Sequence, residues 1–145
     1  MLRSLLTAGA LAATLVASSA GAQTATITIL HNNDGESDFG ADQNGFGTID
    51  RFAQIAAELR AGAVDGSSGN PEGVLFVTSG DNTLPGPEFE ASIQKGVPYF
   101  DSIALDLLDY DVMGVGNHEF DFGTEIFANV IDGIATNQAP WLSAN

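Results

Sequence analysis

The segment DVMGVGNHEFD, residues 111–121, joins a short apolar run to a cluster of chemically versatile side chains. Its apolar half is bounded by glycine, which predicts a buried strand over residues 111–116. An amide, an imidazole and a carboxylate follow at once, at Asn117, His118 and Asp121. Ligands bind open α/β sheets at the carboxyl ends of the strands. This segment therefore predicts a site at a strand end, with side chains that suit metal-assisted chemistry on phosphate.

Two earlier segments repeat this arrangement of an apolar strand followed by polar residues. Residues 27–31 (ITILH) run into 32–36 (NNDGE), and residues 74–78 (VLFVT) run into 79–82 (SGDN). Asp, Asn and Gly also favour turns and helix caps, so each cluster alone leaves a solvated turn or an Asx-turn open. Three clusters at the same edge of one sheet favour a binding site.

Helical periodicity separates these predicted strands. The apolar spacing predicts amphipathic helices over residues 48–60, 99–108 and 124–134, with Thr124 as a plausible N-cap and a surface loop over 61–73. In the second helix, the residues expected to face inward are Phe100, Ile103, Ala104, Leu107 and Leu108. Residues 140–145 predict another buried strand. The resulting order, βαβαβαβ, favours an α/β fold with a mainly parallel sheet and right-handed crossovers.

The first 22 residues have the pattern of a secretory signal peptide. A basic start at Arg3 precedes an apolar stretch over 5–16, and Ala20-Gly21-Ala22 forms a small-residue cleavage site. We expect cleavage after Ala22, a periplasmic or extracellular protein, and no membrane span. Residues 23–145 would then form the N-terminal part of a single domain, because the chain stops at a predicted strand with no element after it.

The charge of the chain is strongly negative, with 4 basic and 19 acidic residues and a formal net charge of −15. This balance argues against a nucleic-acid ligand, which needs a basic surface. It would also repel a phosphate ester unless cations screened the site, which fits metal dependence. An acidic proteome from a salty habitat explains the surface carboxylates equally well. The chain has no cysteine, so its stability must come from a buried core or from metal.

Individual residues differ in how well they suit a catalytic role. His118 is the best candidate, because an imidazole can donate a proton at neutral pH and the carboxylate of Asp121 can hold its orientation. His31 ends a strand among apolar neighbours, so we interpret it as structural. The acidic stretch that begins at Asp34 is not a calcium-binding loop, because Phe39 stands where that loop requires glycine.

Together these motifs resemble the calcineurin-like metallophosphatase superfamily, and in particular its secreted 5′-nucleotidase and 2′,3′-cyclic phosphodiesterase branch. The matching segments are ILHNND over 29–34, GDN over 80–82, GNHEFDFG over 116–123 and SAN over 143–145. The resemblance implies a four-layer α/β/β/α fold and a small phosphate ester, such as a nucleotide, as substrate. It also implies two divalent metal ions, drawn from Mn, Mg, Ca or Zn, and a bridging hydroxide that attacks phosphorus.

The resemblance also implies roles for individual residues. Asp34 would bind the first metal, Asp81 would bridge both metals and Asn117 would bind the second. His118 would contact the phosphate and the leaving group, and Asp121 would orient His118.

Two departures from the family pattern bear on activity. Glu36 stands where the family usually has histidine, and as an anionic oxygen donor it favours Mn, Mg or Ca over Zn. The family's later metal-binding histidines lie beyond residue 145, so we expect the chain as given to bind metal weakly and to be inactive by itself. The competing hypothesis is a non-catalytic exported module that keeps the fold and binds calcium or a protein partner.

Overall fold

A computed structural model describes residues 24–144. The predicted signal peptide, residues 1–22, lies outside the described residues. The strands are β1 (Thr26–Asn32), β2 (Glu72–Thr78), β3 (Val112–Gly114) and β4 (Trp141–Leu142). The helices are α1 (Ile49–Gly62), α2 (Pro87–Lys95), α3 (Phe100–Leu108) and α4 (Thr124–Asp132), and a single 3₁₀ turn, η1 (His118–Phe120), follows β3. Within residues 24–144, no helix is both long and apolar enough to cross a membrane.

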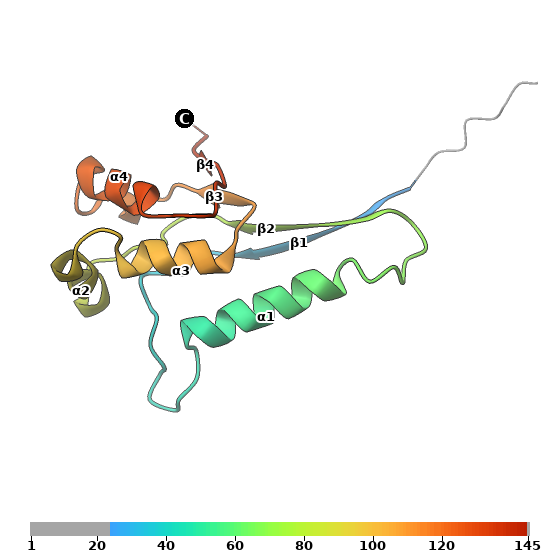
Figure 1. The fold of residues 1–145 in the computed structure, drawn as a ribbon, viewed down its shortest axis with the longest axis horizontal. Coiled ribbons are helices and arrows are strands. Elements are labelled where there is room, and N and C mark those ends of the chain that lie inside the picture. The colour runs from blue at the N-terminus through green and yellow to red at the C-terminus, as the bar shows by residue number, and fades with distance from the viewer. Residues whose placement is uncertain (1–23, 145) are drawn as a thin grey trace, which may run out of the picture.

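The four strands form one parallel sheet in the order β1-β2-β3-β4, which confirms the predicted α/β architecture. Parallel crossovers are right-handed, so strands that are added successively in one direction place their connecting helices on one face of the sheet. In Figure 1, α1 and α3 run along the same side of β1 and β2, and each packs against the other. On the opposite face, Ile27, Ile29 and Leu75 are 65%, 62% and 43% exposed. The described residues thus form one sheet with one helical layer.

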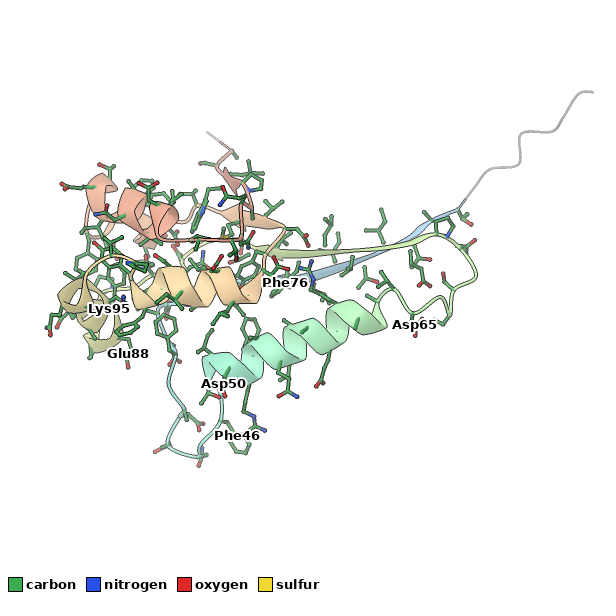
Figure 2. The ribbon with its side chains drawn as sticks, viewed as in Figure 1. Phe46, Asp50, Asp65, Phe76, Glu88 and Lys95 are labelled. Atoms are coloured by element: carbon green, nitrogen blue, oxygen red, sulfur yellow. The ribbon has the colours of Figure 1, made fainter. Side chains whose placement is uncertain are left out.

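The core lies between the sheet and this helical layer. Phe76 points from β2 toward the helices (Figure 2), where its ring contacts Tyr110 at 4.3 Å and Phe52 at 6.2 Å between centroids. Met113 of β3 and Val130 of α4 are also fully buried. Because Phe76 and Met113 lie close to the carboxyl ends of their strands, the best-packed part of the core supports the edge that carries the polar clusters.

The structure corrects several details of the sequence interpretation. Helix α2 was not predicted, although Pro87 at its start and Gly96 just past its end are ordinary helix boundary signals. The N-cap of α4 is Gly123, and Thr124 is the first helical residue. Strand β4 is only two residues long, and Leu142 is 54% exposed rather than buried.

The predicted inward face of α3 is wrong for three of its five residues. Phe100, Ile103 and Leu107 are exposed, whereas the buried residues of the helix are Asp101, Ser102, Ala104, Leu105 and Leu108. The reason is that two polar residues find partners inside the molecule. Asp101 accepts hydrogen bonds from Ser37 and Ser92, and Ser102 donates one to the carbonyl of Val130. An apolar stripe could not identify this face.

Candidate functional site

The loops that follow β1 and β2 are joined by backbone hydrogen bonds. The N–H groups of Asp34, Glu36 and Ser37 donate to the carbonyls of Gly80, Asp81 and Asn82, at 3.1, 3.0 and 2.9 Å. The two loops therefore continue the pairing of β1 with β2 beyond the ends of the strands. The acidic residues of the first loop are held beside Asp81 by the main chain.

Both loops contain unusual backbone conformations. Asp34, Glu36, Ser37 and Asp81 all have positive φ values, between 51° and 57°. This left-handed region is sparsely populated by residues other than glycine, and such residues concentrate at functional sites. The clustering of four such residues at one sheet edge supports a functional role for the two loops.

Two glycines allow the loop after β2 to approach the loop after β3. A Cβ atom added at Gly80 would lie 2.9 Å from the Cα of Gly116, and one added at Gly116 would lie 2.7 Å from the Cγ of Asp81. Side chains at these positions would collide with the neighbouring loop. Glycine is therefore required for the close packing that brings Asp81 next to residues 116–118.

His118 and Asp121 form the predicted pair. Nδ1 of His118 lies 2.6 Å from Oδ2 of Asp121, across the η1 turn, and both side chains are about one-third exposed, at 34% and 31%. The hydrogen bond with Asp121 raises the pKa of His118, burial opposes this shift, and the negative charges of Asp121, Asp81 and Glu36 add to it. Because Asp121 occupies Nδ1, the other ring nitrogen, Nε2, is the atom suited to exchange a proton with a substrate.

Asp81 and the η1 turn are linked directly. Oδ1 of Asp81 accepts a hydrogen bond from the backbone N–H of His118 at 2.9 Å. Glu119, which the sequence reasoning did not single out, is buried and accepts hydrogen bonds from the N–H groups of Asp81, Asn82 and Gly116. The sequence signal that could have found it is its place in the segment GNHEFDFG, directly after His118. The structure thus brings Asp81 and His118 together through hydrogen bonds between side-chain carboxylates and backbone N–H groups.

The proposed metal ligands offer oxygen donors but do not form a complete metal site. Asp34, Glu36 and Asp81 carry carboxylates, and Asn117 is exposed at the same sheet edge. Such donors suit hard divalent cations. Within residues 24–144, however, no three His, Asp or Glu side chains are grouped closely enough to hold a metal ion. The described residues therefore fit part of a ligand set.

A cavity of about 370 Å³ adjoins the loop after β1. Its lining includes the polar residues Asp34, Glu36 and Asn82 and the aromatic residues Phe52 and Tyr110. The hydroxyl of Tyr110 donates to Oδ1 of Asn32 at 2.7 Å, and burial raises the pKa of Tyr110 to about 12, so this group is a neutral donor. The volume is within the range of small-molecule pockets.

His31, which we interpreted as structural, lies apart from this edge. It is in β1, paired with Val77, and its exposed side chain lies on the same uncovered face of the sheet as Ile27 and Ile29. No catalytic role is assigned to it.

Several known proteins are similar to this chain in sequence. Protein UshA of Salmonella pullorum is 34% identical over 100 residues, which cover 68% of this chain and 16% of UshA. The 5′-nucleotidase of Vibrio cholerae serotype O1 is 31% identical over 137 residues, which cover 87% of the chain and 23% of that protein. This chain is related to the 5′-nucleotidase branch of the metallophosphatases. The predicted resemblance is thus confirmed, although no protein-family model matches the chain.

Solved structures of nucleotidases confirm the fold. The NAD nucleotidase NadN of Haemophilus influenzae matches with a TM-score of 0.62 at 22% identity, over 82% of this chain and 20% of that one. The 5′-nucleotidase precursor of Thermus thermophilus matches with a TM-score of 0.55 at 24% identity, over 82% and 22%. The chain spans between 16% and 23% of the relatives and structures that it matches.

Proposed function

We propose that the protein carrying this chain is an exported, metal-dependent phosphoesterase that hydrolyses nucleotides or related small phosphate esters. The observation that carries this proposal is the hydrogen-bonded pair His118 and Asp121, which lies at the carboxyl edge of the sheet and is tied to Asp81 through the N–H of His118. The kinship with 5′-nucleotidases supports the class of substrate.

In this proposal His118 acts on the leaving group. A raised pKa keeps a larger fraction of the imidazole protonated near neutral pH, so that Nε2 can donate a proton to the leaving oxygen. Asp121 fixes the ring through Nδ1 and stabilises the imidazolium. These two residues would contribute proton transfer and orientation.

Asp34, Glu36, Asp81 and Asn117 are proposed to supply part of the ligand set for two divalent cations. When bound, two such cations would provide a hydroxide nucleophile and neutralise charge on the phosphate. The paired loops after β1 and β2 support this role, because they hold the first two acidic residues beside Asp81. The described residues do not form a complete metal site, so we propose that residues 23–145 are inactive by themselves.

The cavity beside the loop after β1 supports a small substrate. Two of the proposed ligands, Asp34 and Glu36, line it, and its aromatic lining residues suit an organic group esterified to phosphate. The absence of basic side chains among its lining residues means that the phosphate itself would depend on the cations for neutralisation.

The direct test is hydrolysis of p-nitrophenyl phosphate and bis(p-nitrophenyl) phosphate by the complete gene product. After chelation, activity should return on addition of manganese, magnesium, calcium or zinc. The metal that restores it best tests whether Glu36 favours manganese, magnesium or calcium over zinc. A protein that binds calcium but hydrolyses neither ester with any metal would instead be the non-catalytic binding module. Export is tested separately, by N-terminal sequencing for cleavage after Ala22.

A further inference from the structure

Glu119 lies where two site loops meet, yet the proposed chemistry leaves it without a role. Its side chain is only 3% exposed, on the η1 turn directly after His118. One carboxylate oxygen, Oε2, accepts hydrogen bonds from the N–H of Gly116 at 2.6 Å and of Asp81 at 3.0 Å. The other, Oε1, accepts from the N–H of Asn82 at 2.7 Å and from its side-chain amide at 3.5 Å.

We propose that Glu119 is a positioning residue that holds Asp81 in its metal-binding orientation by clamping the loop after β2 to the loop after β3. This inference rests on the proposed function. Its motivating observation is that a single buried carboxylate satisfies three backbone donors from two loops that are far apart in the sequence.

The clamp has two halves, one on the main chain of Asp81 and one on its side chain. Glu119 accepts the backbone N–H of Asp81, while the carboxylate of Asp81 accepts the N–H of His118 from the same η1 turn. The φ of Asp81 is 54°, a conformation that needs support from its surroundings. Hydrogen bonds to both its main chain and its side chain supply this support.

The clamp uses both side-chain oxygens of Glu119 as acceptors. Both oxygens of Glu119 face N–H donors, so each must act as an acceptor. A glutamine at this position has nearly the same shape but replaces one acceptor with an NH₂ group. Donor would then face donor on one side of the clamp, whichever way the amide is turned, and the two loops would separate.

This role predicts an effect on metal affinity rather than on the proton-transfer step. Residues that orient metal ligands typically change metal affinity or activity by about 10- to 100-fold when they are replaced. Glu119→Gln should therefore raise the manganese concentration needed for half-saturation by about that factor. A purely structural residue would lower overall stability without a specific change in metal affinity.

The experiment compares the complete gene product with its Glu119→Gln, Glu119→Asp and Glu125→Gln variants. Glu125 is an exposed carboxylate in the first turn of α4 and serves as the matched control. Hydrogen-exchange mass spectrometry is read on peptides that contain residues 79–84 and 114–118, with α1 peptides as the folding check. Manganese affinity is measured by calorimetry, and hydrolysis of p-nitrophenyl phosphate is measured in parallel.

We expect Glu119→Gln to exchange at least about ten times faster in both loop peptides and to bind manganese about 10- to 100-fold more weakly, with α1 unchanged. Glu119→Asp keeps both acceptor oxygens and should lie between wild type and Glu119→Gln. If Glu119→Gln does not fold, the Asp variant decides the matter, and manganese affinity equal to that of the wild type overturns the proposal.

Unchanged loop exchange or unchanged manganese affinity in a folded Glu119→Gln variant also overturns the inference. Failure of the proposed function has a different signature, because the wild type would then hydrolyse no ester with any metal. The exchange and manganese measurements still decide the role of Glu119 in that case.

Discussion

The buried carboxylate of Asp101 provides a sharp test of the energetics of this fold. Ser92 is fully buried on α2, and its Oγ donates to Asp101 and accepts the N–H of Phe100 at 3.1 Å. Ser102 is equally buried, but its hydroxyl donates to a neutral acceptor, the carbonyl of Val130, at 2.8 Å. The two serines are therefore buried hydroxyl donors to a carboxylate and to a neutral carbonyl, and Ser92 is in addition the acceptor for one backbone N–H.

Replacement of each serine by alanine should have unequal costs. A hydrogen bond to a charged group contributes about 1.5–3 kcal/mol to stability, whereas one between neutral groups contributes about 1 kcal/mol. We expect Ser92→Ala to lower the free energy of unfolding by about 2–3 kcal/mol and Ser102→Ala by about 1 kcal/mol. Hydrogen exchange across a urea series, read on peptides from α2 and α3, measures both values.

The pH dependence of the difference follows from the pKa of Asp101. Burial raises this pKa, and the hydrogen bonds from Ser37 and Ser92 lower it, so Ser92→Ala should raise it further. At a pH above the pKa of Asp101 in both the wild type and the Ser92→Ala variant, Asp101 is ionised and Ser92→Ala has its full effect on stability. As the pH falls through these two pKa values, Asp101 becomes neutral and the loss of stability caused by Ser92→Ala becomes smaller. Equal costs for the two serines at a pH above both pKa values, or a cost of Ser92→Ala that grows on acidification, would refute this reasoning.

Three further predictions concern the site and its support. Gly116→Ala should reduce activity at least about tenfold, because its Cβ would lie 2.7 Å from the Cγ of Asp81 and displace a proposed ligand. Gly40→Ala has open space around its Cβ and should leave activity unchanged in the same kinetic assay. Asp111→Ala should cost about 1–3 kcal/mol in urea unfolding, because it removes the acceptor for the N–H of Phe76 at 2.7 Å. Arg60→Ala breaks the partly exposed ion pair with Asp111 at 3.1 Å and an exposed hydrogen bond to the carbonyl of Asp109 at 2.9 Å, and should cost less, about 1 kcal/mol. Asp121→Asn should lower the pKa of His118, so the limb of the pH–rate profile where activity falls with rising pH should move to lower pH; a limb that stays in place would argue against the pair.

The strands and their polar ends could be predicted because both signals are local. Apolar runs such as residues 74–78 stand out from their surroundings, and parallel strands share one carboxyl edge, so Asp34, Asp81 and Asn117 were assigned to the same edge from the sequence. The backbone pairing of the loops after β1 and β2 extends that prediction, since strand pairing continues into both loops.

The features that escaped prediction depend on distant partners. Asp101 and Ser102 are buried because Ser37, Ser92 and the carbonyl of Val130 meet them in space, and no periodicity within α3 reveals these contacts. Glu119 has the same explanation, since its carboxylate is used only when the loops after β2 and β3 come together. Helix α2 is different, because its boundary signals at Pro87 and Gly96 were visible in the sequence.

The measurement that tests the central claim most directly is release of phosphate from a nucleoside 5′-monophosphate by the complete gene product. The wild type and His118→Ala are compared with the same saturating metal, with circular dichroism to confirm that both are folded. We predict metal-dependent release by the wild type and a loss of about a hundredfold or more in kcat for the variant, as general acid catalysis requires. Equal rates for the two proteins, or no release by the wild type with any divalent metal, would contradict an active site at this sheet edge.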